Sequence, residues 1–230
     1  MRPGLIIACV VLGLSTVAWG VTEWLKGSEQ DPPPAVRTEG MSAGEELDLL
    51  LGNVAPTGYG ATPHGMTIAR RNGGAVITLP DGAEIVLTPP EGHVLDDRFV
   101  VLGPAAGGFI LTTPAGRTLY YSFAHAGRRL GPPEDADPAA FYAGIAEVIR
   151  EDGVLPFLDS MLPVTRVSGA AGGVFYCLLR EDGMRFHGAT RFVGPLSVTA
   201  MTAGGCAPGD DGLDRRLSLA ERTIGEGAGR

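Results

Sequence analysis

Two cysteines, Cys177 and Cys206, are the residues of this 230-residue chain whose types point most directly to covalent chemistry. If both cysteines lie outside the cytoplasm, as the N-terminal segment indicates, they are in an oxidising compartment. Two cysteines in such a compartment pair more often than not, so we predict a Cys177–Cys206 disulfide. The enclosed loop has about thirty residues, for which chain entropy gives a stabilisation of about 3.6 kcal/mol. The alternative is a reactive thiol. If residues 181–183 form a three-residue hairpin loop, Cys177 lies opposite His187, and the imidazole can activate the sulfur as a nucleophile.

The histidines do not have the spacing of a metal site. Side chains one, two or four residues apart can reach one metal ion together, and no two histidines of this chain have such a spacing. There is no C-x-x-C motif either, so we predict no metal site and no other cofactor. The four histidines are His64, His93, His125 and His187.

Two pairs of adjacent aspartates, Asp96–Asp97 and Asp210–Asp211, are candidates for shared acid–base work. Neighbouring residues in a strand point to opposite faces, which disfavours shared acid–base work. The chain has no G-x-S-x-G nucleophile elbow, no P-loop and no G-x-G-x-x-G after a strand. We therefore predict no catalytic residue. An enzyme of unknown class remains an alternative, with loop histidines such as His64, His93 and His125 as its acid–base groups.

The charge balance argues against nucleic acid as a partner. The chain has 18 lysines and arginines against 26 aspartates and glutamates, a net charge of −8. Neutralising phosphates needs a basic surface, which this composition does not provide. With 44% hydrophobic and 19% charged residues, the chain has enough apolar surface to form a core.

The N-terminus indicates a location outside the cytoplasm. A basic start precedes residues 5–21, which carry no formal charge. Trp19 and Trp24, with Lys26 beyond them, resemble the interfacial belt of a membrane span. We therefore predict a single-pass anchor over 1–26, with the domain on the extracytoplasmic (periplasmic) side of the cell membrane. The alternative is a signal peptide cleaved near Gly20, which leaves a secreted or periplasmic protein.

A linker follows this segment. Residues 27–40 contain three consecutive prolines and almost nothing apolar, which favours an extended polyproline II spacer. We then predict one β-rich domain over 41–206. The remaining residues, 207–230, are rich in glycine and charge, and we expect a flexible tail there. Alternatively, Leu213, Leu217 and Ile224 form a short amphipathic helix on a partner.

Two segments of the predicted domain resemble each other. Residues 73–87 align without gaps onto residues 107–121, at an offset of 34 residues. Both segments contain Gly-Gly, three apolar residues, a Pro-x-Gly turn and three further apolar residues. Proline presets the turn and glycine accepts positive φ, so each segment predicts a β-hairpin. A looser third example spans 172–186. Convergent hairpin patterns and an internal duplication both explain the similarity.

One amphipathic helix is predicted among these strands. Asp137 is a good N-cap, proline follows at the first helical position, and Gly153 can end the helix. Phe141, Ile145, Val148 and Ile149 form one apolar stripe. A shorter helix is expected over 42–53, where a capping box precedes Leu47, Leu50 and Leu51, which share one face. Together with the hairpins, this predicts an α+β, mainly β domain.

These features favour a non-catalytic role. A tether, a spacer and a β-domain with edge strands that can recruit a partner strand fit a binding or scaffolding module for a protein partner. The alternatives are the secreted or anchored enzyme named above and a ligand-sensing domain.

Overall fold

The computed structural model describes residues 55–152, 164–179, 185–203 and 211–227. The N-terminal apolar segment, the linker, the helix expected over 42–53 and Cys206 lie outside these residues. Within the described part of the chain, no helix has the length and apolar character that a membrane span needs.

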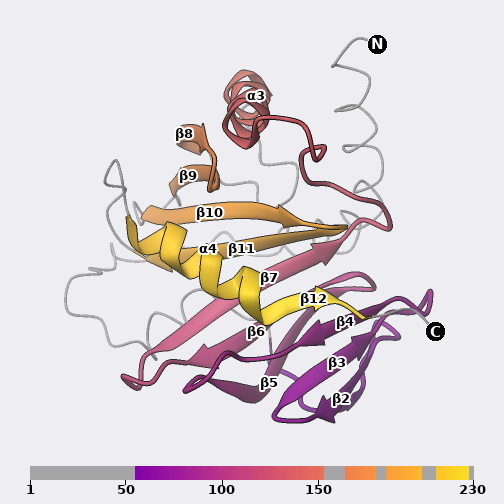
Figure 1. Cartoon of the computed structure of the whole chain (residues 1–230). Coiled ribbons are helices and arrows are strands. Elements are labelled where there is room, and N and C mark those ends of the chain that lie inside the picture. Colours follow the sequence, from indigo (N-terminus) through magenta and orange to yellow (C-terminus); the bar gives the residue numbers. More distant parts are fainter. Residues whose placement is uncertain (1–54, 153–163, 180–184, 204–210, 228–230) are drawn as a thin grey trace, which may run out of the picture.

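Two antiparallel sheets make up most of the fold, as Figure 1 shows, and they confirm the predicted α+β, mainly β class. The larger sheet has seven strands, in the order β5 (Val94–Gly103), β6 (Ala106–Thr112), β7 (Thr118–His125), β11 (Leu196–Ala203), β10 (Arg185–Val193), β9 (Gly173–Leu179) and β8 (Val164–Ala170). The smaller sheet has five, in the order β1 (Gly60–Ala61), β2 (Thr67–Arg71), β3 (Gly74–Thr78), β4 (Glu84–Leu87) and β12 (Ile224–Glu226).

The two similar segments form hairpins that share one turn geometry. In each, a glycine N–H donates to the carbonyl three residues earlier: Gly82 to Leu79 at 2.9 Å, and Gly116 to Thr113 at 2.8 Å. Both glycines have positive φ, 87° and 75°, which explains why the same Pro-x-Gly pattern closes both turns. The first hairpin, β3–β4, belongs to the smaller sheet, and the second, β6–β7, to the larger. The third predicted hairpin corresponds to the antiparallel pair β9–β10.

The main core lies between the two sheets and the helix α4 (Asp211–Thr223). Side chains of β2, β3 and β4 meet side chains of β6, β7 and β11 there, among them the fully buried Ile77, Phe109 and Tyr121. A second cluster lies on the opposite face of the larger sheet, where the helix α3 (Pro138–Asp152) covers β8 and β9. Both faces of the central strands are therefore buried.

The helix α3 begins where the sequence predicts it. The Asp137 carboxylate accepts a hydrogen bond from the Ala139 N–H at 3.0 Å, which caps the first turn. Its buried face differs slightly from the predicted stripe. Tyr142, Ala146 and Ile149 are the buried residues, whereas Ile145 is only partly buried. The face that contacts the sheet is thus centred about one residue away from the predicted stripe, because Tyr142 packs inward with its ring.

The expectation of a flexible tail over 207–230 does not hold for residues 211–226. These residues form α4 and β12, and β12 pairs with β4. Figure 1 shows α4 lying along β10 and β11 and continuing into the smaller sheet. Leu213, Leu217 and Ala220 follow a helical spacing and are buried in the main core. The apolar face that the sequence suggested for a partner is therefore covered by the chain's own strands.

Candidate functional site

Cys177 and His187 are register partners in the ladder between β9 and β10. This is the placement that the three-residue loop predicts. Both residues are buried, with 3% and 7% of their surface exposed. His187 is also the register partner of Thr202 on β11. Residues directly opposite in antiparallel strands point to the same face, so these three side chains form a row across the sheet. The Cys177–Cys206 bond stays a prediction, because Cys206 lies outside the described residues.

The other three histidines lie in separate loops or strand ends. His64 is exposed between β1 and β2. The His93 ring is 3.2 Å from the Glu91 carbonyl, and His125 Nδ1 accepts a hydrogen bond from the Gly127 N–H at 3.3 Å. These contacts are local, so the structure does not bring the three imidazoles together. Among the described residues there is no group of three or more possible metal ligands.

Asp96 of the first carboxylate pair forms a local ion pair. Its carboxylate accepts hydrogen bonds from the Arg98 guanidinium at 2.9 and 2.8 Å. This contact lowers the pKa of Asp96 below its ordinary value, although partial burial opposes the effect. An aspartate held in its charged form by an arginine is suited to a structural role in β5 rather than to proton transfer. Asp210 and the Asp211 side chain lie outside the described part.

A different set of side chains surrounds a cavity of about 450 Å³, which we call the arginine pocket. It lies where the turn between β6 and β7 and the end of β11 meet the first half of α4. Among the described residues, two threonines and three arginines supply its polar groups, and three leucines and a glycine also line it. The lining residues are Thr113, Arg117, Leu119, Thr202, Gly212, Leu213, Arg215, Arg216 and Leu219.

The arginine pocket has a positive charge that the described residues do not balance. None of its described lining residues is a carboxylate. No carboxylate in the described part of the chain forms an ion pair with Arg117, Arg215 or Arg216. Arg117 and Arg215 are exposed. Among the described residues, three guanidinium groups around one cavity are a marked local excess of positive charge in a chain of net charge −8.

Arg216 lies deepest of the three arginines. It is partly buried, and its guanidinium donates to the Met201 carbonyl at 3.3 Å. Burial raises the pKa of Tyr121 far above its ordinary value, and the Arg216 charge lowers it by a smaller amount. The Tyr121 hydroxyl is itself buried without a hydrogen-bond partner among the described residues. Arg216 is therefore held against the sheet, where its charge acts on the buried hydroxyl.

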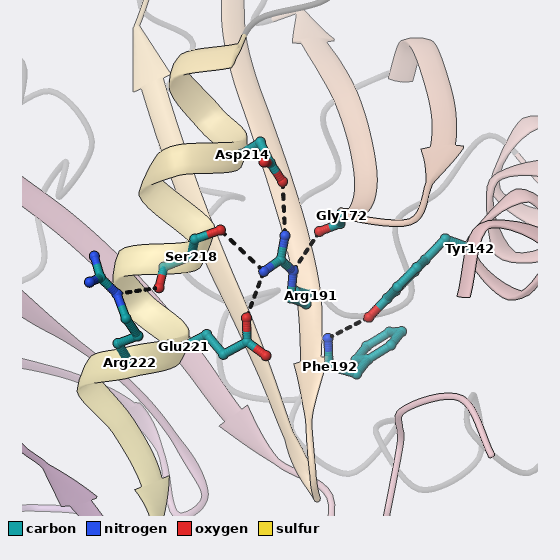
Figure 2. Close-up of polar contacts among 8 residues, drawn as sticks. All are labelled: Tyr142, Gly172, Arg191, Phe192, Asp214, Ser218, Glu221 and Arg222. Carbon is teal, nitrogen blue, oxygen red and sulfur yellow. Dashed lines mark hydrogen bonds and ion pairs between the residues drawn. The ribbon is translucent and has the colours of Figure 1, made fainter. Parts of the chain in front are cut away.

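The helix that supplies two of the three arginines is fixed by Arg191 of β10 (Figure 2). The Arg191 guanidinium forms ion pairs with Asp214 at 2.9 Å and Glu221 at 2.6 Å, which lie about two turns apart on α4. Its Nε donates to the Gly172 carbonyl at 2.6 Å. Only 14% of the Arg191 side chain is exposed, so these bonds are shielded from water on the arginine's side. This clamp holds α4 in a fixed position on the sheet.

The opposite face of β10 is fixed in a similar way. The Phe192 N–H donates to the Tyr142 hydroxyl of α3 at 3.1 Å, as Figure 2 shows. The Tyr142 and Phe192 rings stack with their centroids 5.9 Å apart. Neighbouring residues of one strand thus bind the helices on both sides of the sheet. The strand that carries His187 is consequently held by α3 and α4 together.

Comparison with protein-family models, curated proteins and solved structures finds no match to this chain. Its function is therefore inferred from the geometry of the chain itself.

Sequence reasoning does not predict the arginine pocket. Its arginines come from a hairpin turn and from a helix about a hundred residues further along, so no local spacing connects them. The available signal is the helical spacing of Leu213, Leu217 and Ala220. That spacing places Arg216 at the border of the apolar face, whereas Arg215, one residue earlier, lies on the exposed side of the helix.

Proposed function

We propose that this chain is a non-catalytic, membrane-tethered binding module outside the cytoplasm, and that it binds the anionic group of its partner in the arginine pocket. The observation that carries this proposal is the set of three guanidinium groups around one cavity, without a carboxylate among the described lining residues. A guanidinium stays protonated at any physiological pH and donates in a fixed fork. Such groups are suited to holding an anion.

The fixed position of α4 supports a preformed site. Arg191 binds the helix on the side facing β10, and Leu213 and Leu217 bury its apolar face in the core. Side chains on a rigid helix lose less conformational freedom on binding than side chains on a loop. The helix thus presents Arg215 and Arg216 from a fixed position on the sheet.

Titration of the full chain with small ions tests the binding proposal. We use phenyl phosphate and benzoate as anions, and benzylammonium as a ligand of similar size and opposite charge. At low ionic strength at least one anion should bind, and benzylammonium should not. Arg215→Gln should weaken binding. Arg71→Gln is the matched control, since Arg71 is exposed on β2 of the other sheet. Absence of binding by both anions, or equal binding of benzylammonium, would contradict the proposal.

The membrane tether needs a separate test. An uncleaved anchor keeps the protein with membranes after carbonate washing, and mass spectrometry then finds residue 1. A mature N-terminus at Val21 would instead show that residues 1–20 are a signal peptide, as in the alternative of the sequence analysis.

A further inference from the structure

The positive charge on the described lining of the arginine pocket exceeds what a single carboxylate can balance. One guanidinium binds both oxygens of a carboxylate through two parallel hydrogen bonds. The pocket offers three guanidinium groups, from Arg117, Arg215 and Arg216. A phosphate monoester carries a charge of about −1.5 to −2 at neutral pH and three strong acceptor oxygens, so it can bond to more than one arginine at once.

Hydroxyl groups add donors at the same place. The Thr113 Oγ1 accepts a hydrogen bond from the backbone N–H of Arg117 at 3.1 Å. The hydroxyl proton of Thr113 is therefore available to a ligand oxygen. Thr202 contributes a second hydroxyl to the lining. A tetrahedral group with three acceptor oxygens suits this combination of forked and single donors better than a planar carboxylate does.

The remaining lining residues give the pocket an apolar side. Leu119, Leu213 and Leu219 line it and are otherwise buried, at 8%, 0% and 7% exposure. The cavity of about 450 Å³ lies in the size range of small-molecule sites. It can therefore accommodate an organic group attached to the anion.

From these observations we infer that the arginine pocket binds a soluble organic phosphate monoester, with the phosphate at Arg117, Arg215 and Arg216 and the organic group against the leucines. This inference rests on the proposed function, because it specifies the anion that the same pocket takes. The ion pairs of Arg191 with α4 hold the helix that carries two of the three arginines in place before the ligand arrives.

Phenyl phosphate and benzoate form the matched pair that tests the inference, since they share a ring and differ in the anionic group. By calorimetry on the full chain, phenyl phosphate should bind at least about tenfold more tightly than benzoate, the effect of one further charged hydrogen bond. Equal affinities would overturn the inference and leave the proposed function standing. If neither anion binds, both fail.

Two variants test whether the phosphate binds at the arginines of the pocket. Arg117→Gln and Arg215→Gln should each weaken phenyl phosphate binding by about tenfold or more. Arg71→Gln should change it by less than about twofold, because that arginine lies in the other sheet and its loss changes the net charge equally. Both pocket arginines are exposed, so the variants should keep the melting temperature of the parent chain. Folded variants with unchanged affinity would overturn the inference.

Vesicles distinguish a soluble ligand from a lipid headgroup of the same chemistry. The full chain is reconstituted into phosphatidylcholine vesicles with or without phosphatidic acid, whose headgroup is also a phosphate monoester. Phenyl phosphate should bind equally in both preparations. Loss of phenyl phosphate binding in the vesicles with phosphatidic acid would show that the headgroup occupies the pocket, which would overturn the assignment to a soluble ligand.

Discussion

His187 on β10 lies directly opposite Cys177 on β9, and both side chains are on the sheet face that carries α4. Thr202 is the partner of His187 on the next strand and also lines the arginine pocket. The buried cysteine, the histidine and the pocket are therefore connected by one row of neighbouring residues.

The packing of α3 gives a first prediction. Ile149 is fully buried against the larger sheet, whereas Ile145 is only partly buried. Ile149→Ala should lower the free energy of unfolding by about 2–4 kcal/mol, because it removes buried methyl groups and leaves a cavity. Ile145→Ala should cost less. Urea denaturation measures the free energy of unfolding of both variants. An equal or larger loss for Ile145→Ala would show that the predicted stripe, and not the face of Tyr142, Ala146 and Ile149, is buried.

The C-terminal helix gives a second prediction. Leu217 is 1% exposed in the main core, while Arg222 on the same helix is exposed. Leu217→Ala should destabilise the protein by about 2–4 kcal/mol. Arg222→Ala should change stability by less than about 0.5 kcal/mol, as is usual for surface positions. An unchanged urea midpoint for Leu217→Ala would contradict the packing of α4 and support the flexible tail that the sequence predicts over residues 207–230.

Two glycines give a third prediction, with opposite signs. A Cβ at Gly188 would overlap the ring of Tyr176, whose hydroxyl bonds to Thr190 at 3.2 Å. Gly188→Ala should destabilise the protein by about 1–3 kcal/mol through overpacking. A Cβ at Gly144 of α3 would meet no atom within 4 Å apart from the helix's own backbone, so Gly144→Ala should stabilise by about 0.5–1 kcal/mol through its higher helix propensity. Thermal melts that shift in the same direction for both variants would refute this account.

The elements that the sequence predicts correctly are those with local causes. The hairpin turns at Gly82 and Gly116 need only a proline two residues before the glycine, and both turns form. The start of α3 depends on Asp137 and the proline that follows it. The pairing of Cys177 with His187 follows from the loop length between their strands. Each of these features is determined within about ten residues.

The parts that sequence reasoning misses depend on distant contacts. The pairing of β7 with β11 and of β4 with β12 joins segments far apart in the chain, and no local pattern selects these partners. Residues 207–230 resemble a tail because glycine and charge dominate them, yet Leu213 and Leu217 are buried by strands that precede them. The arginine pocket has the same origin, since it exists only after α4 docks beside the turn that carries Arg117.

The final prediction is the Cys177–Cys206 disulfide. The third cysteine, Cys9, lies in the N-terminal apolar segment. Denatured full chain prepared without reductant should show no free thiol beyond Cys9, and a tryptic peptide pair containing Cys177 and Cys206 should be found by mass spectrometry. Cys177→Ser and Cys206→Ser should each lower stability by about 2–4 kcal/mol, and the double variant should be no less stable than either single variant.

The alternative of a nucleophilic Cys177 predicts different results for the same variants. A thiol activated by His187 would be labelled by iodoacetamide at neutral pH in the folded chain, and Cys206→Ser would have almost no effect on stability. Cys177 is only 3% exposed, so slow labelling is expected even for a chain in which the bond has been reduced. Labelling of the reduced and the unreduced chain must therefore be compared. Rapid labelling of Cys177 without reductant would contradict the disulfide and support an enzyme. Labelling that requires both reductant and denaturant would support a structural disulfide between Cys177 and Cys206.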